Sequence, residues 1–251
     1  MYIFLCNLCI NALYGTAGFY PRFLSDLLSD DQVISYGGCV TQGFVIYTSV
    51  MCEITLLTAM AYDRYVAICK PLQYHTLLTP ATVGKIIVLA WCYPLLISGI
   101  AVLLTVRLPL CGSRICKLFC DNGSILQHSC APVTINRIWS AFTLAGQILQ
   151  VILIGWSYLQ ITRVCLRSEE GRLKFTQTCV PHLLTMVIFI VVTLFDVLNS
   201  FYGDQNMPLN LRNLMALQFL IVPPVFNPVI YGLNLQKVRT AVFIRKNKIR
   251  Y

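Results

Sequence analysis

Long apolar stretches alternate with short polar segments along this chain. A helix needs about 20 apolar residues to cross a bilayer core of about 30 Å, and six stretches reach that length. Each of them contains no charged residue or only a single acid: 1–21, 32–62, 86–106, 138–162, 175–202 and 213–236. The pattern predicts an all-α integral membrane protein, a single domain over 1–251 with six transmembrane helices and a polar tail over 237–251.

The composition agrees with a membrane protein and excludes a soluble globular fold. Hydrophobic residues make up 57% of the chain and charged residues 12%, whereas an average soluble domain has about 25% charged residues. A soluble domain of this length would leave much of that apolar surface in water, so the bilayer is the natural solvent for this chain.

Basic residues lie mainly in alternate loops and in the tail, which by the positive-inside rule face the cytoplasm. These segments hold most of the 19 Lys and Arg residues: Arg64, Lys70, Lys85, Arg163, Arg167, Arg172, Lys174, Lys237, Arg239, Arg245, Lys246, Lys248 and Arg250. The net charge of +9 therefore reflects loops beside anionic lipid. We do not expect nucleic acid as a partner, because the basic residues are divided among loops between spans.

The most specific motif lies where the second apolar stretch ends, and residues 60–71 there read MAYDRYVAICKP. The string resembles the third-helix terminus of odorant receptors within the rhodopsin-like family of G-protein-coupled receptors. Two further strings resemble the same family. KFTQTCVPHLLTM, from Lys174, is similar to the start of its sixth helix, and PPVFNPVIYGL, from Pro223, is similar to the NPxxY segment of its seventh helix.

The first apolar stretch, MYIFLCNLCINALYG, resembles the second helix of that family. The resemblance thus implies a seven-helix receptor bundle in which family helices 2–7 are present and the first transmembrane helix is lacking. It implies an olfactory receptor, a multi-pass protein of the plasma membrane that binds small odorant molecules. It also implies activation of a heterotrimeric G protein of the olfactory stimulatory type.

We expect no enzyme activity, because the sequence shows no nucleophile–base pair, no phosphate-binding loop and no paired catalytic acids. Two alternatives to a signalling receptor are a non-signalling truncated remnant and a six-span channel or transporter subunit. A channel or transporter requires a polar pore stripe, a re-entrant segment or paired halves, and the sequence shows none of these.

The family couples to its G protein at the cytoplasmic ends of the helices. Carried over position by position, the coupling residues are Asp63, Arg64, Tyr65, Tyr158, Asn227, Pro228 and Tyr231. The alternative for Asp63 and Arg64 is a pair of interfacial charges that reach water along the membrane surface. His182, in the sixth-helix string, is expected to be a polar packing residue rather than a proton switch.

The resemblance places the odorant among the outer halves of the third, fifth, sixth and seventh helices. The implied walls are Gly43, Ile46, Tyr47, Val50, Phe142, Gly146, Thr193, Leu194, Val197, Leu217 and Leu220. Most are apolar, so burial at about 25 cal/mol per Å² would supply most of the affinity. The alternative is that these residues only pack the helices against one another and line no ligand site. For Asp196, near the outer end of its span, we favour contact with interfacial water over contact with the ligand.

Five cysteines lie on the predicted outer face, where disulfides form: Cys39, Cys111, Cys116, Cys120 and Cys130. The family pairs a cysteine at the outer end of its third helix with one in its second extracellular loop. The match to LPLCG, LFCD and HSC implies Cys39–Cys120 and Cys111–Cys130, with Cys116 left over. Free buried thiols are the alternative.

Glu53 lies in the middle of an apolar span, where a carboxylate costs about 3 kcal/mol, so it should face the bundle. The family has a sodium-binding site at this level, and Na⁺ near Glu53 is the only cofactor or metal that the resemblance suggests. Ala12 replaces the usual acidic partner, with Asn11 beside it. A neutral Glu53 bonded to Ser or Asn is the alternative.

Asn122 begins an N-glycosylation sequon on the predicted outer loop. The alternative is a match to the sequon that is not glycosylated.

Overall fold

The computed structural model describes residues 2–29, 32–115 and 118–202, together with Ile221 and Val225. Five long helices run through this part of the chain: α1 (Tyr2–Leu27), α2 (Tyr36–Cys69), α4 (Pro80–Val106), α6 (Thr134–Cys165) and α8 (Val180–Tyr202). Four short helices connect them: η1 (Pro71–Gln73), α3 (Tyr74–Leu77), α5 (Asn122–Gln127) and α7 (Glu169–Thr178). The sixth predicted span and the tail lie outside the described residues, apart from Ile221 and Val225.

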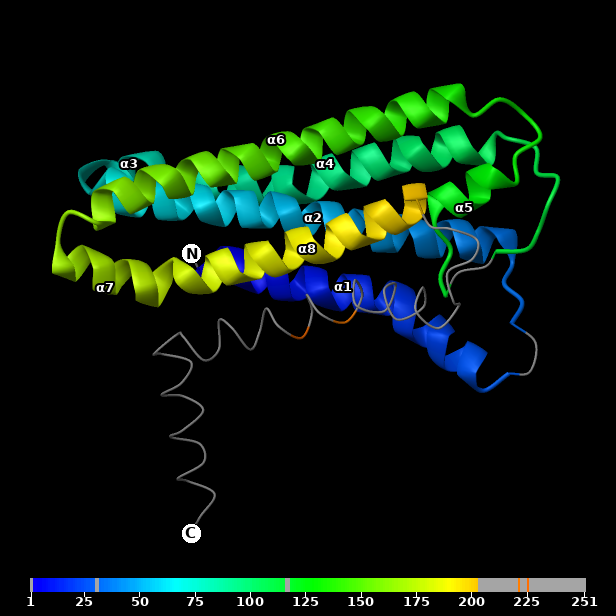
Figure 1. The fold of residues 1–251 in the computed structure, drawn as a ribbon, viewed down its shortest axis with the longest axis horizontal. Helices are drawn as coiled ribbons and strands as arrows, with labels where there is room; N and C mark the ends of the chain where they lie inside the picture. The colour runs from blue at the N-terminus through cyan, green and yellow to red at the C-terminus, as the bar shows by residue number, and fades with distance from the viewer. Residues whose placement is uncertain (1, 30–31, 116–117, 203–220, 222–224, 226–251) are drawn as a thin grey trace, which may run out of the picture.

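Four helices, α1, α2, α4 and α6, are each long and apolar enough to cross a membrane, and α7 with α8 forms a bent fifth. The long helices run antiparallel to their neighbours along the chain (Figure 1). Helix α2 packs against α1, α4 and α6 and is the central element of the bundle. The described part of the chain is thus an all-α membrane bundle, as predicted.

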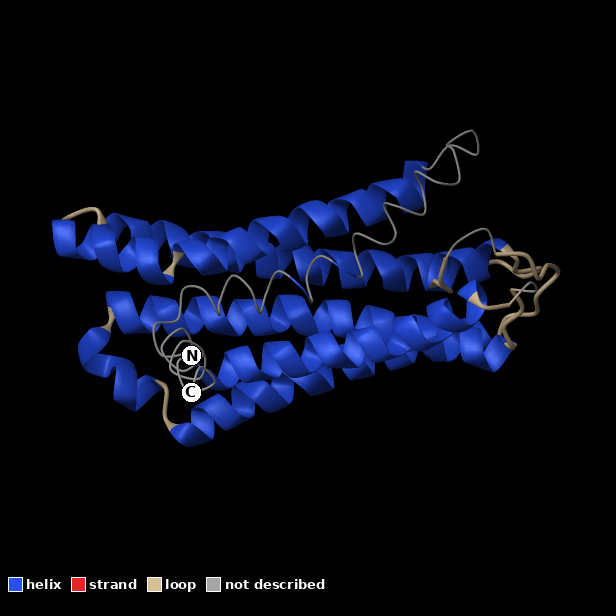
Figure 2. Cartoon of the chain, turned by 90° about the horizontal axis from the view of Figure 1, so that it is seen from below, coloured by secondary structure: helices blue, strands red, loops and turns tan. Residues whose placement is uncertain are grey.

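The two ends of the bundle differ. We call the end that carries α3 and α7 the inner end, and the end that carries α5 and the long loops the outer end (Figures 1 and 2). The predicted cytoplasmic segments around Arg64, Lys70 and Arg167 lie at the inner end. The loop between α4 and α6 lies at the outer end.

Several helices extend beyond the apolar stretches that predicted them, because a charged residue at a helix end does not stop the backbone hydrogen bonds. Helix α2 continues past the predicted end at Tyr62 to Cys69 and stops before Pro71, whose ring disfavours helical geometry at the preceding residue. Helix α4 begins at Pro80 instead of residue 86, where Thr79 accepts a hydrogen bond from the Thr82 backbone N–H.

The predicted span 175–202 is one stretch in the sequence but two helices in the structure. Helices α7 and α8 meet at Cys179 and are bent by 46°. Pro181 has no backbone N–H to donate. A proline is tolerated in the first turn of a helix, where that N–H would have no partner within the helix, but it disrupts a helix interior. The helix therefore restarts just before this proline.

Helices α1 and α2 approach closely at two glycines. A methyl group at Gly15 would lie 2.4 Å from the Ser49 Oγ, and one at Gly18 would lie 2.6 Å from a methyl carbon of Val45. Small residues allow helices in a membrane to pack backbone against side chain. The spacing of Gly15 and Gly18 thus fixes how α1 lies on the central helix.

Candidate functional site

The acid–base motif of α2 lies at the inner end of the bundle. Asp63 is buried, with 3% of its surface exposed, and its Oδ1 accepts a hydrogen bond of 3.0 Å from the Tyr74 hydroxyl. This bond ties the short helix α3 to α2. Burial, and then the nearby Asp63 carboxylate, raise the pKa of Tyr74, so its hydroxyl keeps the proton that it donates.

The two residues after Asp63 are half-buried. The Lys70 ammonium lies 5.9 Å from the centre of the Tyr65 ring, a distance at which a cation and an aromatic face attract each other. Arg64 is the basic residue nearest to Asp63 in the chain. Arg64 and Tyr65, two of the predicted coupling residues, lie on the last turns of α2, beside the loop that carries α3.

Tyr158 of α6 meets His182 of α8 inside the bundle. The Tyr158 hydroxyl and the His182 Nδ1 are 2.7 Å apart, and the two rings stack with their centres 5.5 Å apart. Both side chains are buried. His182 is thus buried against a predicted coupling residue, a contact that the sequence reasoning did not anticipate.

Three of the predicted coupling residues, Asn227, Pro228 and Tyr231, lie outside the described residues. Their role stays a prediction from the NPxxY resemblance. Among the described residues, two polar contacts lie toward the inner end: Asp63 with Tyr74, and Tyr158 with His182.

The structure contains both expected disulfides at the outer end. Cys39–Cys120 links α2 to the loop before α5, with the two Cα atoms 5.2 Å apart. Cys111–Cys130 closes the same loop on itself, with the Cα atoms 5.5 Å apart. Cys116 lies outside the described residues. The cross-links hold the loop across the outer end of α2.

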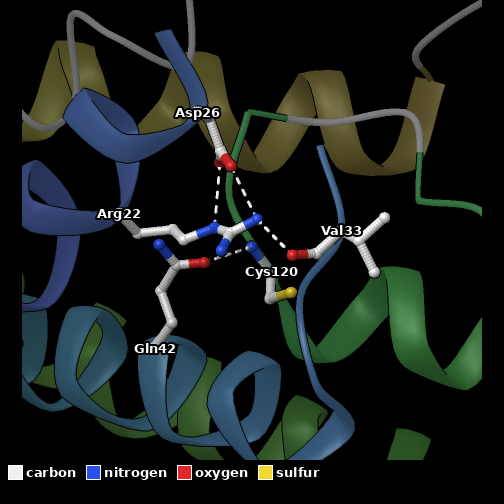
Figure 3. A network of polar contacts seen from close by, with 5 residues as sticks. All are labelled: Arg22, Asp26, Val33, Gln42 and Cys120. Atoms are coloured by element: carbon white, nitrogen blue, oxygen red, sulfur yellow. Dashed lines mark hydrogen bonds and ion pairs between the residues drawn. The ribbon is translucent and has the colours of Figure 1, made fainter. Parts of the chain in front are cut away.

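The anchored loop lies directly on the predicted ligand wall of α2. A methyl group at Gly43 would lie 3.2 Å from the Cys120 carbonyl oxygen, so glycine at this position permits the close approach of the loop. The Cys120 backbone N–H donates to the Gln42 Oε1 over 3.0 Å, as Figure 3 shows. The sequence reasoning missed Gln42, although a polar amide within an apolar stretch is a recognisable signal.

Two other predicted wall residues of α2 belong to an apolar cluster. Ile46 is buried with Phe19 of α1, Phe119 of the loop and Val192 of α8, and Val50 packs against this group. Phe19 and Phe119 meet edge to face with ring centres 6.4 Å apart. The structure therefore adds side chains from α1 and from the loop to the predicted wall.

The remaining predicted wall residues are more scattered. Tyr47 is half-buried, and the Thr193 hydroxyl is buried without a hydrogen bond to the described residues. A methyl group at Gly146 would lie 3.1 Å from the Tyr93 hydroxyl. Phe142 and Leu194 are 60% and 52% exposed in the described part of the bundle. The side chain of Val197 is not described, and Leu217 and Leu220 lie outside the described residues.

Glu53 lies in the middle of α2 and is 8% exposed. One turn before it, the Ser49 hydroxyl donates to the Asn11 backbone carbonyl, and the Asn11 amide donates to the Ser49 carbonyl over 2.9 Å. The Asn11 Oδ1 is buried and accepts no hydrogen bond from the described residues. Carboxylate, amide and hydroxyl oxygens are suitable ligands for a hard cation, so these residues fit the suggested Na⁺.

The sequon residue Asn122 takes part in a packed polar chain. Its Oδ1 accepts from the Thr105 hydroxyl over 2.6 Å, and that hydroxyl accepts from the Asn136 amide over 3.2 Å. Ser124, the third sequon residue, is buried. The contacts join α4, α5 and α6 at the outer end. Glycosylation at Asn122 stays a prediction.

Comparison with known proteins finds similarity along almost the whole chain. A sequence model described as olfactory receptor matches residues 1–246. Olfactory receptor 52J3 of Homo sapiens is 35% identical over 245 residues, which are 96% of this chain and 78% of that relative. Olfactory receptor 2C1 of Mus musculus is 32% identical over 248 residues, again 96% and 78% of the two chains.

The match thus covers the bundle from α1 through α8 and includes both the inner and the outer site. Olfactory receptors are multi-pass proteins of the plasma membrane and are not enzymes. The match therefore confirms the expected localisation and the expectation that the chain is not an enzyme. The chain belongs to the olfactory receptor family of G-protein-coupled receptors.

Proposed function

We propose that this chain binds small, mostly apolar odorants at its outer end and activates a heterotrimeric G protein, of the olfactory stimulatory type, at its inner end. The observation that carries the proposal is the inner-end site. Asp63 holds α3 through Tyr74, and Tyr158 holds α8 through His182. Each contact joins two elements, so each is a place where a change of helix packing alters the inner surface.

The proposed ligand site and the proposed coupling site are far apart on one helix. Ile46 and Arg64 both belong to α2, and the rise of about 1.5 Å per residue separates them by about 27 Å. An odorant at Ile46 therefore does not touch Arg64. It acts by binding better to the arrangement of helices that accepts the G protein, since a ligand shifts an equilibrium only by such a difference in affinity.

The inner-end residues have separate parts in this proposal. Asp63 and Tyr74 order the loop after α2, Arg64 and Tyr65 face the G protein, and Tyr158 supports the inner end of α6. Asn227, Pro228 and Tyr231 complete the inner surface. Glu53 and Asn11 would hold a sodium ion, which would supply a fixed positive charge between α1 and α2.

The test is the response of cells that carry the chain, measured as odorant-stimulated cyclic AMP at matched surface level. Arg64→Ala should abolish the response, because it removes a side chain proposed to face the G protein. It should leave odorant binding intact, because Arg64 is too distant to touch the ligand. Tyr47→Ala should instead shift the dose–response curve and leave the basal signal intact. Arg137→Ala is the control, since this exposed arginine lies at the outer end of α6. A normal response from Arg64→Ala would contradict the proposed coupling site.

A further inference from the structure

Gln42 is a buried amide of α2 with one unused hydrogen-bonding group. Only 7% of the residue is exposed. Its Oε1 accepts from the Cys120 backbone N–H, whereas its Nε2 donates to none of the described residues. A buried donor without an acceptor keeps its full desolvation cost, so a ligand that supplies an acceptor here gains affinity.

The surroundings of Gln42 on its inner side are apolar. Residues four apart share one face of a helix, and four residues after Gln42 comes Ile46, which is 1% exposed and packs with Phe19 and Phe119. The free amide donor therefore lies at the outer edge of an apolar and partly aromatic cluster. Such a setting suits a ligand with an apolar body and one polar atom.

The charged groups next to Gln42 already have partners. Figure 3 shows the Arg22 guanidinium directed toward Asp26 and Val33. Arg22 pairs with the Asp26 carboxylate at 2.6 Å and donates to the Val33 carbonyl. Among the residues of this network the unused group is a neutral donor. A ligand carboxylate buried here would find no unpaired positive charge in this network and would cost more to desolvate than a neutral acceptor, and an ammonium group has no acceptor to offer.

We propose that the Gln42 Nε2 donates a hydrogen bond to an acceptor oxygen of the bound odorant. The ligand class is thus a neutral, apolar molecule with a carbonyl or ester oxygen. The inference rests on the proposed function, because it assigns a ligand to the same outer site. The ligand's apolar part lies against Ile46 and Phe19, in place of the Phe119 ring that the loop now places there.

The probes are straight-chain methyl ketones from 2-pentanone to 2-octanone, each compared with the alkane of equal carbon number at equal vapour saturation. The measurement is the thermal stabilisation of the full chain in lipid nanodiscs. Ketones should stabilise the wild-type chain more than alkanes do. One neutral hydrogen bond corresponds to a roughly fivefold to tenfold difference in affinity.

Two variants separate ligand recognition from loop anchoring. In Gln42→Glu an ionised carboxylate keeps an oxygen for the Cys120 N–H and removes the donor, whereas Gln42→Met removes both. Both variants should weaken ketone binding about fivefold to tenfold and leave alkane binding unchanged. Gln127→Met makes the same substitution at an exposed outer position and should bind both probes as the wild type does.

Two outcomes would overturn the inference: equal stabilisation of the wild type by ketones and alkanes, or undiminished ketone binding by Gln42→Glu. Cyclic AMP measured with the same ketones reports separately on the proposed function. Ketone stabilisation that depends on Gln42 but yields no cyclic AMP would support the ligand class and contradict the signalling role.

Discussion

Single polar side chains at the inner end each join two helices. Asp63 accepts a hydrogen bond from Tyr74, and Tyr158 shares one with His182. A buried group that loses its partner retains its desolvation cost. Removing a single hydroxyl or ring nitrogen from these contacts should therefore lower the stability of the fold, even though the helices themselves stay intact.

Tyr74→Phe removes one hydroxyl and the hydrogen bond that it donates to the buried Asp63 carboxylate. The loss should be about 1 kcal/mol, a fall of about 2–4 °C in the unfolding temperature for a chain of this size. Thermal unfolding in detergent measures it. Tyr62→Phe removes the same hydroxyl from an exposed position and should change nothing. Equal unfolding temperatures for Tyr74→Phe and the wild type would show that the bond is unimportant.

The pH dependence of this contact has a definite sign. Because the folded state raises the pKa of Tyr74 above the ordinary value of 10.0, folding favours the protonated phenol. The stabilisation is therefore fully present below about pH 10 and is lost as the pH rises through the folded-state pKa. The difference between wild type and Tyr74→Phe should be constant at neutral pH and shrink only in strong alkali.

The elements of the bundle were largely predictable, and their contacts were not. Apolar length alone locates α1, α2, α4 and α6, because only a continuous helix satisfies the backbone in lipid. The break at Cys179 depends on how Pro181 packs, and the partner of Tyr158 depends on which helices meet. Neither is visible in a pattern of apolar residues. Both outer disulfides followed from the family resemblance, whereas the loop contact at Gln42 needed coordinates.

Helix packing itself yields a prediction at Gly18. Gly18→Ala puts a methyl group 2.6 Å from the Val45 side chain, and β-branched valine cannot easily turn away. Such overpacking costs about 1–3 kcal/mol. Gly99→Ala is the matched control, because nothing lies within 4 Å of the added methyl. Thermal unfolding should show a loss for Gly18→Ala only; equal stability of the two variants would contradict the close approach.

The whole molecule has a predicted orientation that the charge distribution sets. Epitope tags inserted within 64–85 or 163–174, or after residue 237, should be inaccessible to antibody on intact cells, because basic loops remain in the cytoplasm. A tag between α4 and α6 should be accessible. Labelling before and after permeabilisation measures this. Exposure of two of the three inner tags on intact cells would reverse the assignment of the two ends.

Helix α2 has the geometry of a long, unbroken lever. It contains no proline, whereas α1 contains Pro21 and α4 contains Pro94, so it lacks the usual cause of a kink. Its disulfide fixes Cys39 to the outer loop, and Cys69 lies about 45 Å further along the axis. A tilt of about 5° about that fixed point would move the inner end by about 4 Å. A small adjustment near the proposed odorant site would thus become a displacement large enough to change the surface offered to the proposed G protein.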